Sequence, residues 1–564
     1  MANSQLRCPP PACVDQPATG LSLQRPLINL CGLGSSMIAT LVIMFCSLLP
    51  TVASAADFEQ GLALLAEKSF AKKSHAIEVL AASKHPQTLS LLQAMSRGDL
   101  YYRKKDKRIV LTTKIDSGYQ ISDAITGEGL GSVGKRKVKK VSINNTLRSQ
   151  LTQAIAALQL ANGSPQIRLD ALESMLPNVN AASLSLLQQR ADLETDSDVN
   201  AVLSIAIAIA QLDSGDEVIR LQALEQLDGS LYPSVRNRIQ TLVNDDPSKK
   251  VKRSATAILK SIDGQINLFG NLQTLFFGIS LGSVLVLAAI GLAITFGVMG
   301  VINMAHGELI MIGAYTTYVV QQLMPNSIEY SLLVAVPAAF LVSGMVGIAI
   351  ERGVIRHLYG RPLETLLATF GLSLVLQQAV RTVFSPLNRQ VETPEWMSGV
   401  WELNSVFSLT LNRLYIIAFC LIVFFALHMI LKRTRLGLQV RAVSQNRQMA
   451  RAMGVRSEWV DAMTFGLGSG VAGVAGVALS QLTNVGPNLG QAYIIDSFMV
   501  VVFGGVGNLW GTLVAGLSLG IANKIMEPWA GAVLAKILVL VFIILFIQKR
   551  PRGLFPQKGR AAEG

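Results

Sequence analysis

The run Asn303-Met304-Ala305-His306-Gly307-Glu308 places an imidazole and a carboxylate two residues apart, between two long apolar stretches. If those stretches cross a membrane, each group costs about 2–3 kcal/mol where it faces lipid. A chain keeps such groups when they face protein, a water-filled path or a hinge. We therefore expect a latch or gate at a helix end, with a packing motif as the alternative.

A catalytic or metal-binding role for the same pair has little support. A zinc site on a helix needs a second ligand four residues from the first histidine, and His306 lacks one. In the sequence, no Ser or Cys nucleophile is paired with His306 or Glu308. The sequence predicts neither an enzyme nor a metal site here.

The composition indicates that this run lies in a membrane protein. Of 564 residues, 51% are hydrophobic and 15% are charged, which is unusual for a soluble protein. The charged residues lie mostly in the first half, and long apolar runs begin near Phe269. The net charge of +13 does not indicate nucleic-acid binding, because many basic residues lie in short loops beside apolar runs. We predict a soluble part followed by a membrane part.

Nine stretches in the second half are candidate membrane spans, since a helix needs about 20 mostly apolar residues to cross a bilayer. Glycines cluster at 466–476 and 504–511, which allows close helix packing or a hinge. The two short candidates around 492–526 are compatible with broken or re-entrant helices. The nine candidates cover residues 272–297, 301–321, 331–350, 363–381, 412–431, 460–481, 492–507, 509–526 and 532–548.

Basic residues between the spans predict the orientation. Loops 351–362 and 432–456 and the tail from Lys549 carry fifteen Lys and Arg residues, whereas the opposite loops carry Arg389 alone. Because positive charge marks the cytoplasmic side, the first span enters from outside and the C-terminus is cytoplasmic. The opposite loops are 322–330, 383–410, 482–491 and 527–531.

The amino terminus is typical of an export signal. Arg25 precedes an apolar stretch from Met37 to Leu49, and the small residues Ala53-Ser54-Ala55 follow. We expect cleavage after Ala55, with an uncleaved anchor starting near Leu27 as the alternative. Either form places residue 57 onward outside the cytoplasm. Four of the five cysteines precede this site, so no disulfide framework or thiolate metal site is expected.

Residues 164–263 repeat one plan, in which an Asp or Ser caps a helix and an aliphatic–basic pair follows. Val199 lies 32 residues after Ile167, and Val251 lies 33 residues after Val218. Paired helices stacked at this period are similar to HEAT-like repeats. Unrelated amphipathic helices are the alternative.

The rest of residues 56–266 has mostly helical spacing, interrupted near 100–145 by short strand-like runs around glycine-rich turns. Within this insertion, Gly129 to Arg136 matches G-x-G-x-x-G and nearly matches a phosphate-binding loop. Arg136 replaces the hydroxyl residue that binds magnesium, and strand-like residues follow, so no helix N-terminus meets a phosphate. We expect a hairpin turn here and no cofactor bound by this chain.

Four groups of residues in the second half form motifs. They are Asn303–Glu308 with Gly313 and Tyr315 after it, Thr434–Gly437 with Arg441–Val455, the glycine-rich stretch Gly504–Gly511, and the terminal stretch Arg550–Phe555. Together they resemble the motifs of permeases of the branched-chain amino-acid ABC importer family. Thr434–Val455 is similar to the cytoplasmic coupling loop of that family. The resemblance covers residues 270–556, about half of the chain.

Two features resemble the urea transporter permeases within that family. One is the helical domain of about 200 residues ahead of the spans, and the other is the run Arg441-Ala-Val-Ser-Gln-Asn446-Arg447. Ordinary branched-chain amino-acid permeases lack the extension and usually carry an acid near position 446. The resemblance therefore implies import of urea. Import of a branched-chain or other amino acid is one alternative, and a membrane receptor with a repeat domain is another.

The resemblance also implies fold, location and partners. The fold class is all-α, a polytopic helical permease of about eight or nine transmembrane helices in the bacterial inner membrane, preceded by the exported HEAT-like domain. The implied partners are membrane lipid, a second homologous permease, two cytoplasmic ATPases that bind ATP, and a periplasmic substrate-binding protein. The expected parts are a signal peptide or anchor at 1–55, a periplasmic domain at 56–266, a transmembrane domain at 270–556 and a cytoplasmic tail at 557–564.

Two sets of site residues are expected. Exposed arginines on a short cytoplasmic helix would dock in a groove of an ATPase, and small residues would allow close approach. A neutral amide such as urea needs hydrogen-bonding groups along its path and no counter-charge. We assign coupling to Arg435, Gly437, Arg441, Ala442, Arg447, Ala450 and Gly454. We assign the path or gate to Asn303, His306, Gly307, Glu308, Gln481, Asn484, Asp496, Gly505 and Gly507.

Overall fold

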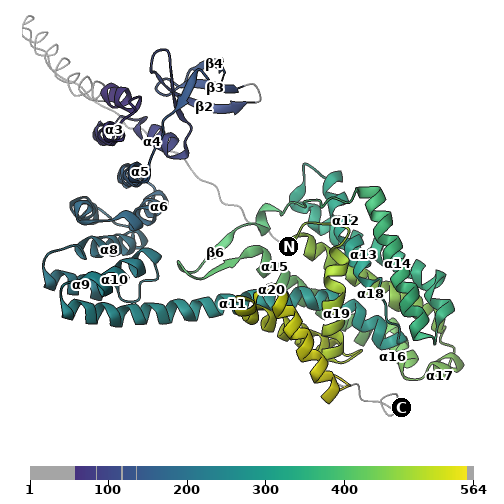
Figure 1. The fold of residues 1–564 in the computed structure, drawn as a ribbon. Helices are drawn as coiled ribbons and strands as arrows, with labels where there is room; N and C mark the ends of the chain where they lie inside the picture. The colour runs from purple at the N-terminus through teal and green to yellow at the C-terminus, as the bar shows by residue number, and fades with distance from the viewer. Residues whose placement is uncertain (1–57, 84, 116–117, 135, 556–564) are drawn as a thin grey trace, which may run out of the picture. The chain divides into compact units, whose positions relative to one another are not determined.

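The computed structural model shows a mostly helical chain, as the sequence predicted (Figure 1). It describes residues 58–83, 85–115, 118–134 and 136–555. The predicted leader and the tail lie outside the described residues. The chain forms two compact units, Met1–Ser214 and Gly215–Gly564.

The first unit combines helices with one sheet. Its main core gathers apolar residues of the helices with residues of the first two strands, such as Leu80, Leu92, Leu100 and Leu151. The helices are α3 (Phe70–Ala82), α4 (Thr88–Arg97), α5 (Asn145–Gln159), α6 (Pro165–Met175), η1 (Leu176–Asn178), η2 (Ala181–Ser183), α7 (Leu184–Ala191) and α8 (Ser197–Gln211).

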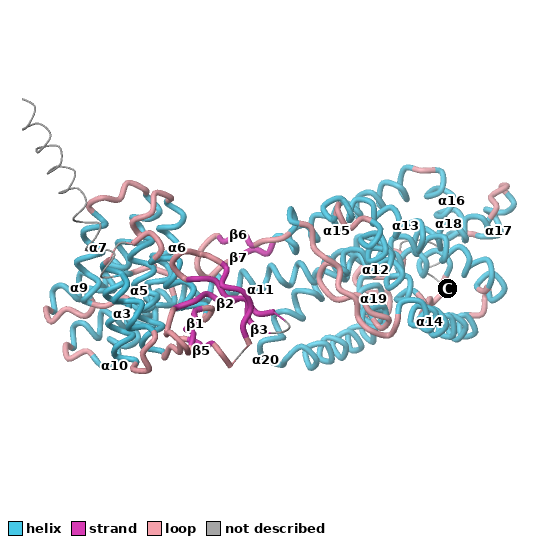
Figure 2. The backbone as a smooth tube through the Cα atoms, turned by 90° about the horizontal axis from the view of Figure 1, so that it is seen from above, coloured by secondary structure: helices cyan, strands magenta, loops and turns pink. Residues whose placement is uncertain are grey.

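The sheet is antiparallel with the strand order β4-β3-β2-β1-β5 (magenta in Figure 2). Its strands are β1 (Leu100–Arg103), β2 (Ile109–Ile115), β3 (Gly118–Asp123), β4 (Gly129–Val133) and β5 (Val138–Lys140). The prediction of a hairpin turn at 129–136 is wrong. The strands on either side of this run, β4 and β5, are not paired with each other and lie at opposite edges of the sheet. The glycine-rich run is itself an edge strand.

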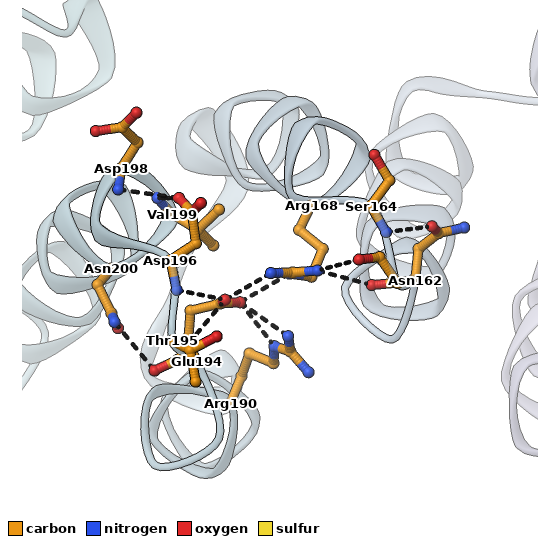
Figure 3. A network of polar contacts seen from close by, with 11 residues as sticks. Asn162, Ser164, Arg168, Arg190, Glu194, Thr195, Asp196, Asp198, Val199 and Asn200 are labelled. Carbon is orange, nitrogen blue, oxygen red and sulfur yellow. Dashed lines mark hydrogen bonds and ion pairs between the residues drawn. The ribbon is translucent and has the colours of Figure 1, made fainter. Parts of the chain in front are cut away.

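A buried ion pair recurs in the helical part, once in each unit. Arg168 on α6 donates to both carboxylate oxygens of Glu194, just before α8, at 2.6 and 2.8 Å (Figure 3). In the second unit, Arg220 pairs with Asp246 at 3.0 Å. Arg220 follows Arg168 by 52 residues, and Asp246 follows Glu194 by the same number. The spacing of 32–33 residues therefore separates equivalent positions on the first and third helices of a group of three. The same ion pair recurs 52 residues later, in the next group of three helices. The HEAT-like assignment stays a prediction.

Glu194 makes the first unit sensitive to acid. Hydrogen bonds from Arg168, then from Arg190 and two backbone amides, lower the pKa of Glu194 from 4.5 to about 2, against the opposing effect of burial. Since the unfolded chain keeps the ordinary pKa, the stabilisation is complete above pH 4.5 and is lost as the pH falls towards 2. We expect the difference in Tm between the wild-type chain and Glu194→Gln to be largest above about pH 5 and to shrink below about pH 4. A difference that does not change with pH contradicts this account.

The second unit contains two short helices followed by the long apolar helices. Helix α11 is continuous over 51 residues, so no break separates its charged first turns from the first apolar stretch. Its elements are α9 (Glu217–Leu227), α10 (Pro233–Asp245), α11 (Lys249–Met299), α12 (His306–Leu323), α13 (Ile328–Gly353), η3 (Ile355–Leu358), α14 (Pro362–Phe384), η4 (Glu395–Met397), β6 (Val400–Glu402), β7 (Ser408–Thr410), α15 (Leu411–Arg433), α16 (Arg435–Gln445), α17 (Arg447–Ala452), α18 (Ser457–Ser480), α19 (Leu489–Gly504) and α20 (Leu509–Lys549).

Six helices in the described part of the chain are long and apolar enough to cross a membrane, where the sequence suggested nine. They are α11, α13, α14, α15, α18 and α20. The candidate at 301–321 is not among them, because α12 begins only at His306 and carries polar residues. The candidate at 492–507 lies in α19, which has only 16 residues.

The last two candidates, 509–526 and 532–548, are two arms of α20. The backbone leaves helical geometry at Gly531, with φ 75°, three residues after Pro528. Both ends of α20 return to the end of α19. The Phe546 ring lies 4.9 Å from that of Phe503, and a Cβ added at Gly504 would overlap the backbone of Gly511. The two arms are therefore antiparallel.

Helix α18 is the most deeply buried candidate span, and its glycines allow neighbouring helices to reach backbone contact. A Cβ added at Gly313 of α12 would overlap the backbone of Gly473. A Cβ at Gly468 would lie 2.7 Å from the carbonyl oxygen of Gly291 on α11. At these glycines the close contacts favour packing over a hinge.

Candidate functional site

The polar run is held at the junction before α12. The Asn303 side chain accepts a hydrogen bond from the backbone N–H of Ala305 at 3.0 Å, and α12 then begins at His306. The hydroxyl of Thr369 on α14 accepts from the N–H of Met304 at 3.1 Å. These two bonds satisfy backbone donors that precede the helix, so the non-helical segment is tolerated inside the apolar bundle.

The His306 ring links α12 to α11. Its Nε2–H donates to the backbone carbonyl of Ala288 at 2.9 Å, and the ring is fully buried. Within the described residues, the other nitrogen, Nδ1, has no partner. Gly291 leaves room for the ring, since a Cβ there would lie 2.9 Å from the ring carbon Cε1. A side chain at 291 would therefore disturb this link.

The Glu308 carboxylate links α12 to α14. Its Oε1 accepts from the Ser373 hydroxyl at 2.9 Å and from the Gln377 amide at 2.8 Å. The side chain is buried, and Oε2 meets no donor among the described residues. Oε2 is thus an unused acceptor inside the bundle, available to a polar group that enters it.

Helix α14 buries only polar side chains. They recur every four residues, so they share one face of the helix, and three of them meet the polar run. This polar face was not predicted, although the spacing of four residues is visible in the sequence. The buried residues are Thr365, Thr369, Ser373 and Gln377. The exposed apolar residues of the same helix include Leu363, Leu367, Phe370, Leu374 and Val375.

Replacing Glu308 tests the link to α14. In Glu308→Ala the buried Ser373 hydroxyl and Gln377 amide lose their acceptor, at about 1–3 kcal/mol for each group left unpaired. Glu308→Gln keeps the volume and one acceptor oxygen. We expect Glu308→Ala to lower solute uptake about tenfold or more and to lower Tm, while Glu308→Gln stays within about threefold of the wild-type uptake. Equal behaviour of the two variants contradicts this role.

The predicted glycines of the path lie at close backbone contacts. A Cβ at Gly307 would lie 2.6 Å from the carbonyl oxygen of Gly490 on α19. Gly505 has φ 104°, and a Cβ there would lie 2.6 Å from the carbonyl oxygen of Phe555. Gly507 has φ 79°. The glycine-rich stretch and the terminal motif therefore contact each other, and positive φ and lack of space both require glycine.

Two of the remaining path candidates have other partners than the polar run among the described residues. The backbone carbonyl of Gln481 accepts from the Asn412 amide at 2.7 Å, and Asn484 is exposed. Asp496 forms an ion pair with Lys536 at 3.0 Å, so its charge is already neutralised within the chain. Across the described residues, no group of three His, Cys, Asp or Glu side chains could hold a metal ion.

Six of the seven predicted coupling residues lie on α16 and α17, which are capped by Thr434 and Asn446 respectively, and Gly454 follows α17. Arg435 and Arg441 are exposed. Arg447 is not free, because it forms an ion pair with Asp461 and lies over the Tyr359 ring, 4.0 Å from its centroid. Only the first two of these three arginines are available to a partner.

The small residues of this segment serve contacts within the chain. A Cβ at Gly437 would overlap the carbonyl of Leu431, at the end of α15. Ala450 is buried in a cluster with Val440, Val443 and Val460 of neighbouring helices, and Ala442 is half-buried beside it. These side chains are small because the segment folds against α15 and α18.

Gly454 differs from the other small residues. A Cβ there would meet open space, but the backbone has φ 84°, which glycine adopts without strain. The residue lines a cavity of about 550 Å³ together with buried Glu351. Four arginines line the same cavity, namely Arg352, Arg356, Arg451 and Arg456. Glu458 also lines it and pairs with Arg356, so this end of the bundle presents a concave surface with an excess of basic residues.

Comparison with known proteins identifies relatives of the membrane half. A family model described as branched-chain amino acid transport system / permease component matches residues 274–547. The chain is 31% identical to the high-affinity branched-chain amino acid transport system permease protein BraD of Pseudomonas aeruginosa, over 51% of this chain and 96% of the relative. It is 31% identical to the corresponding protein LivH of Escherichia coli K12, over 50% of this chain and 94% of the relative.

A more distant relative is the ribose import permease protein RbsC of Escherichia coli K12, 26% identical over 45% of this chain and 78% of the relative. No solved structure matches the chain. About half of this chain accounts for nearly the whole of BraD and LivH, so the other half has no counterpart in them.

Proposed function

The chain belongs to the family of branched-chain amino acid transport system permeases, and we propose that it is the translocation subunit of an ATP-driven importer for urea. Family membership together with the apolar helices implies an inner-membrane protein. Family membership gives no support to the hypothesis that the chain is a membrane receptor with a repeat domain. Import of a branched-chain amino acid, which the names of BraD and LivH suggest, is the alternative.

The polar face of α14 carries the proposal about the solute. Its buried groups are hydroxyls and one amide, which carry no charge, and the acid bonded to them is Glu308. A neutral amide can exchange hydrogen bonds with all of these groups. A zwitterionic amino acid needs counter-charges for both its ammonium and its carboxylate, and Glu308 could serve only the ammonium. The extension that BraD and LivH lack also supports a distinct branch of the family.

The proposed complex has the partners that the sequence predicted. A second homologous permease completes the membrane part, two cytoplasmic ATPases bind ATP, and a periplasmic binding protein delivers the solute. In this arrangement the first unit lies in the periplasm, and the loop containing Arg435 and Arg441 faces the ATPases.

Uptake by the complete complex in proteoliposomes tests the proposal. With ATP inside and the binding protein outside, we expect accumulation of labelled urea and little accumulation of labelled leucine. Leucine uptake without urea uptake would replace the substrate with a branched-chain amino acid. Failure to accumulate any solute would overturn the transport function.

A further inference from the structure

The sheet of the first unit has an open face that the proposed transport path does not use. On this face Val110, Ile121 and Val138 form a small buried cluster, and Tyr101 and Tyr119 pack beside it. The two tyrosine rings lie 5.2 Å apart. Residues of the opposite face belong to the main core of the unit. One face of the sheet is thus used for folding, and the other presents two half-buried aromatic rings.

Lysines flank the tyrosines on this open face. Lys140 of β5 is paired directly with Tyr101 of β1, and Lys114 of β2 is paired directly with Tyr119 of β3. Directly opposed residues of neighbouring strands point to the same side of a sheet. Both lysines are exposed, and among the described residues neither has an acidic partner. We call Tyr101, Tyr119, Lys114 and Lys140 the tyrosine–lysine face.

The whole insertion is strongly basic. Residues 97–140 contain twelve Lys and Arg against five Asp and Glu, compared with 49 against 36 in the full chain. Within the described part of the chain, ion pairs engage Arg97, Arg103, Lys107 and Arg108 of this insertion. The basic residues that are not in these ion pairs give the sheet a positive electrostatic potential, which attracts acidic surfaces. The exposed lysines nearby are Lys104, Lys105, Lys137 and Lys139.

The residue types distinguish a protein partner from a lipid surface. Segments that insert into a membrane interface present Trp, Phe or Leu opposite basic residues. The tyrosine–lysine face instead has partly buried tyrosines at its centre and charge at its edge, which is the composition of a protein interface. Tyrosine is enriched among residues that dominate binding energy, because it buries a large area and keeps a hydroxyl for hydrogen bonding.

We propose that the tyrosine–lysine face docks an acidic surface of the soluble substrate-binding protein that delivers solute to the permease. This inference rests on the proposed function, which supplies that partner and places it on the same side of the membrane as the first unit. Complementary charge increases the association rate and makes it depend on salt. The face therefore raises the local concentration of loaded binding protein and takes no part in the passage of solute.

Binding of the fluorescently labelled binding protein to the complete importer in nanodiscs tests this docking. The variant Lys114→Glu/Lys140→Glu reverses two charges, and Tyr101→Ala/Tyr119→Ala removes the rings. We expect each double variant to raise Kd at least tenfold, and the first to remove most of the salt dependence. The matched control Lys68→Glu/Arg148→Glu reverses two exposed charges of the same unit outside the sheet and is expected to leave Kd unchanged.

Solute uptake separates the outcomes. The lysine variant is expected to import slowly at a low concentration of binding protein and at the wild-type rate when binding protein is saturating. Equal Kd values for the wild type and both double variants overturn the docking proposal, even when uptake is normal. Binding to phosphatidylglycerol vesicles that depends on Lys114 and Lys140, with no effect of these residues on the binding protein, also overturns it. If wild-type proteoliposomes import nothing, the proposed function fails and the docking proposal fails with it.

Discussion

Gly313→Leu is expected to prevent the second unit from assembling. In α12 this glycine touches the backbone of Gly473 in α18, so there is no space for a single carbon, let alone four. Overpacking usually costs about 1–3 kcal/mol, and here the atoms in the way belong to the backbone of Gly473, which cannot move aside as a side chain can. The two helices would have to separate along their contact. Purified protein should then show no monodisperse peak in size-exclusion chromatography and no cooperative thermal transition.

Gly371→Leu is the matched control. Gly371 also lies within a candidate membrane helix, α14, but a Cβ there meets nothing within 4 Å. The control has the same change in helix propensity and in apolar surface, so it isolates the effect of the α12–α18 contact. We expect its yield and Tm to remain close to those of the wild type. If Gly313→Leu behaves like Gly371→Leu, the backbone contact is not needed for the fold.

The sequence predicted those structural features that depend on the residues of a single segment. Apolar runs long enough to cross a bilayer predicted α11, α13, α14, α15 and α18, because a single helix must satisfy its own backbone in lipid. The reversal inside α20 was also visible, since Pro528 and Gly531 separate two apolar runs. The short α19 was expected to be unusual for its length and glycine content.

Features that depend on which face of a helix a residue occupies were not predicted. α14 was recognised as an apolar span, and the periodicity of its polar residues was overlooked. Thr369, Ser373 and Gln377 are separated by single turns, so a helical projection would have placed them on one side. In residues 164–263 the spacing of 32–33 residues connects the first and third helices of a group, and the sequence pattern alone did not show that a further helix lies between them.

Pairings across the fold were beyond what the sequence could show. Asp496 was assigned to the path as a lone acid, but Lys536 neutralises it from the second arm of α20, 40 residues away. Arg447 was assigned to a partner, but Asp461 pairs with it across the loop to α18. Each assignment treated a charged side chain as free. A charge in a membrane protein usually has a partner, and the fold decides which one.

Gly454→Glu is expected to abolish uptake while the protein remains in the membrane. The carboxylate would lie at the edge of the cavity beside Arg451 and Arg456, where it would pair with arginines that otherwise face the ATPases in the proposed complex. A Cβ at this position contacts no other atoms. The cost in folding free energy is therefore the backbone strain of a side chain at φ 84°, on the order of 1–2 kcal/mol. The amount of protein in membranes and its Tm should therefore change little. Uptake by the reconstituted complex should fall about a hundredfold or more, in keeping with a lost charge-assisted interface.

Gly454→Asn separates charge from backbone strain. Asparagine tolerates the left-handed region better than other residues and carries no charge, so this variant should keep most of the uptake. If Gly454→Asn and Gly454→Glu lose uptake equally, the cause is backbone geometry and not the charge. If Gly454→Glu imports normally, this end of the bundle does not couple to an ATPase. Co-purification of the ATPases with each variant tests docking directly. If the loss of uptake is due to lost docking, the ATPases should not co-purify with Gly454→Glu and should co-purify with Gly454→Asn.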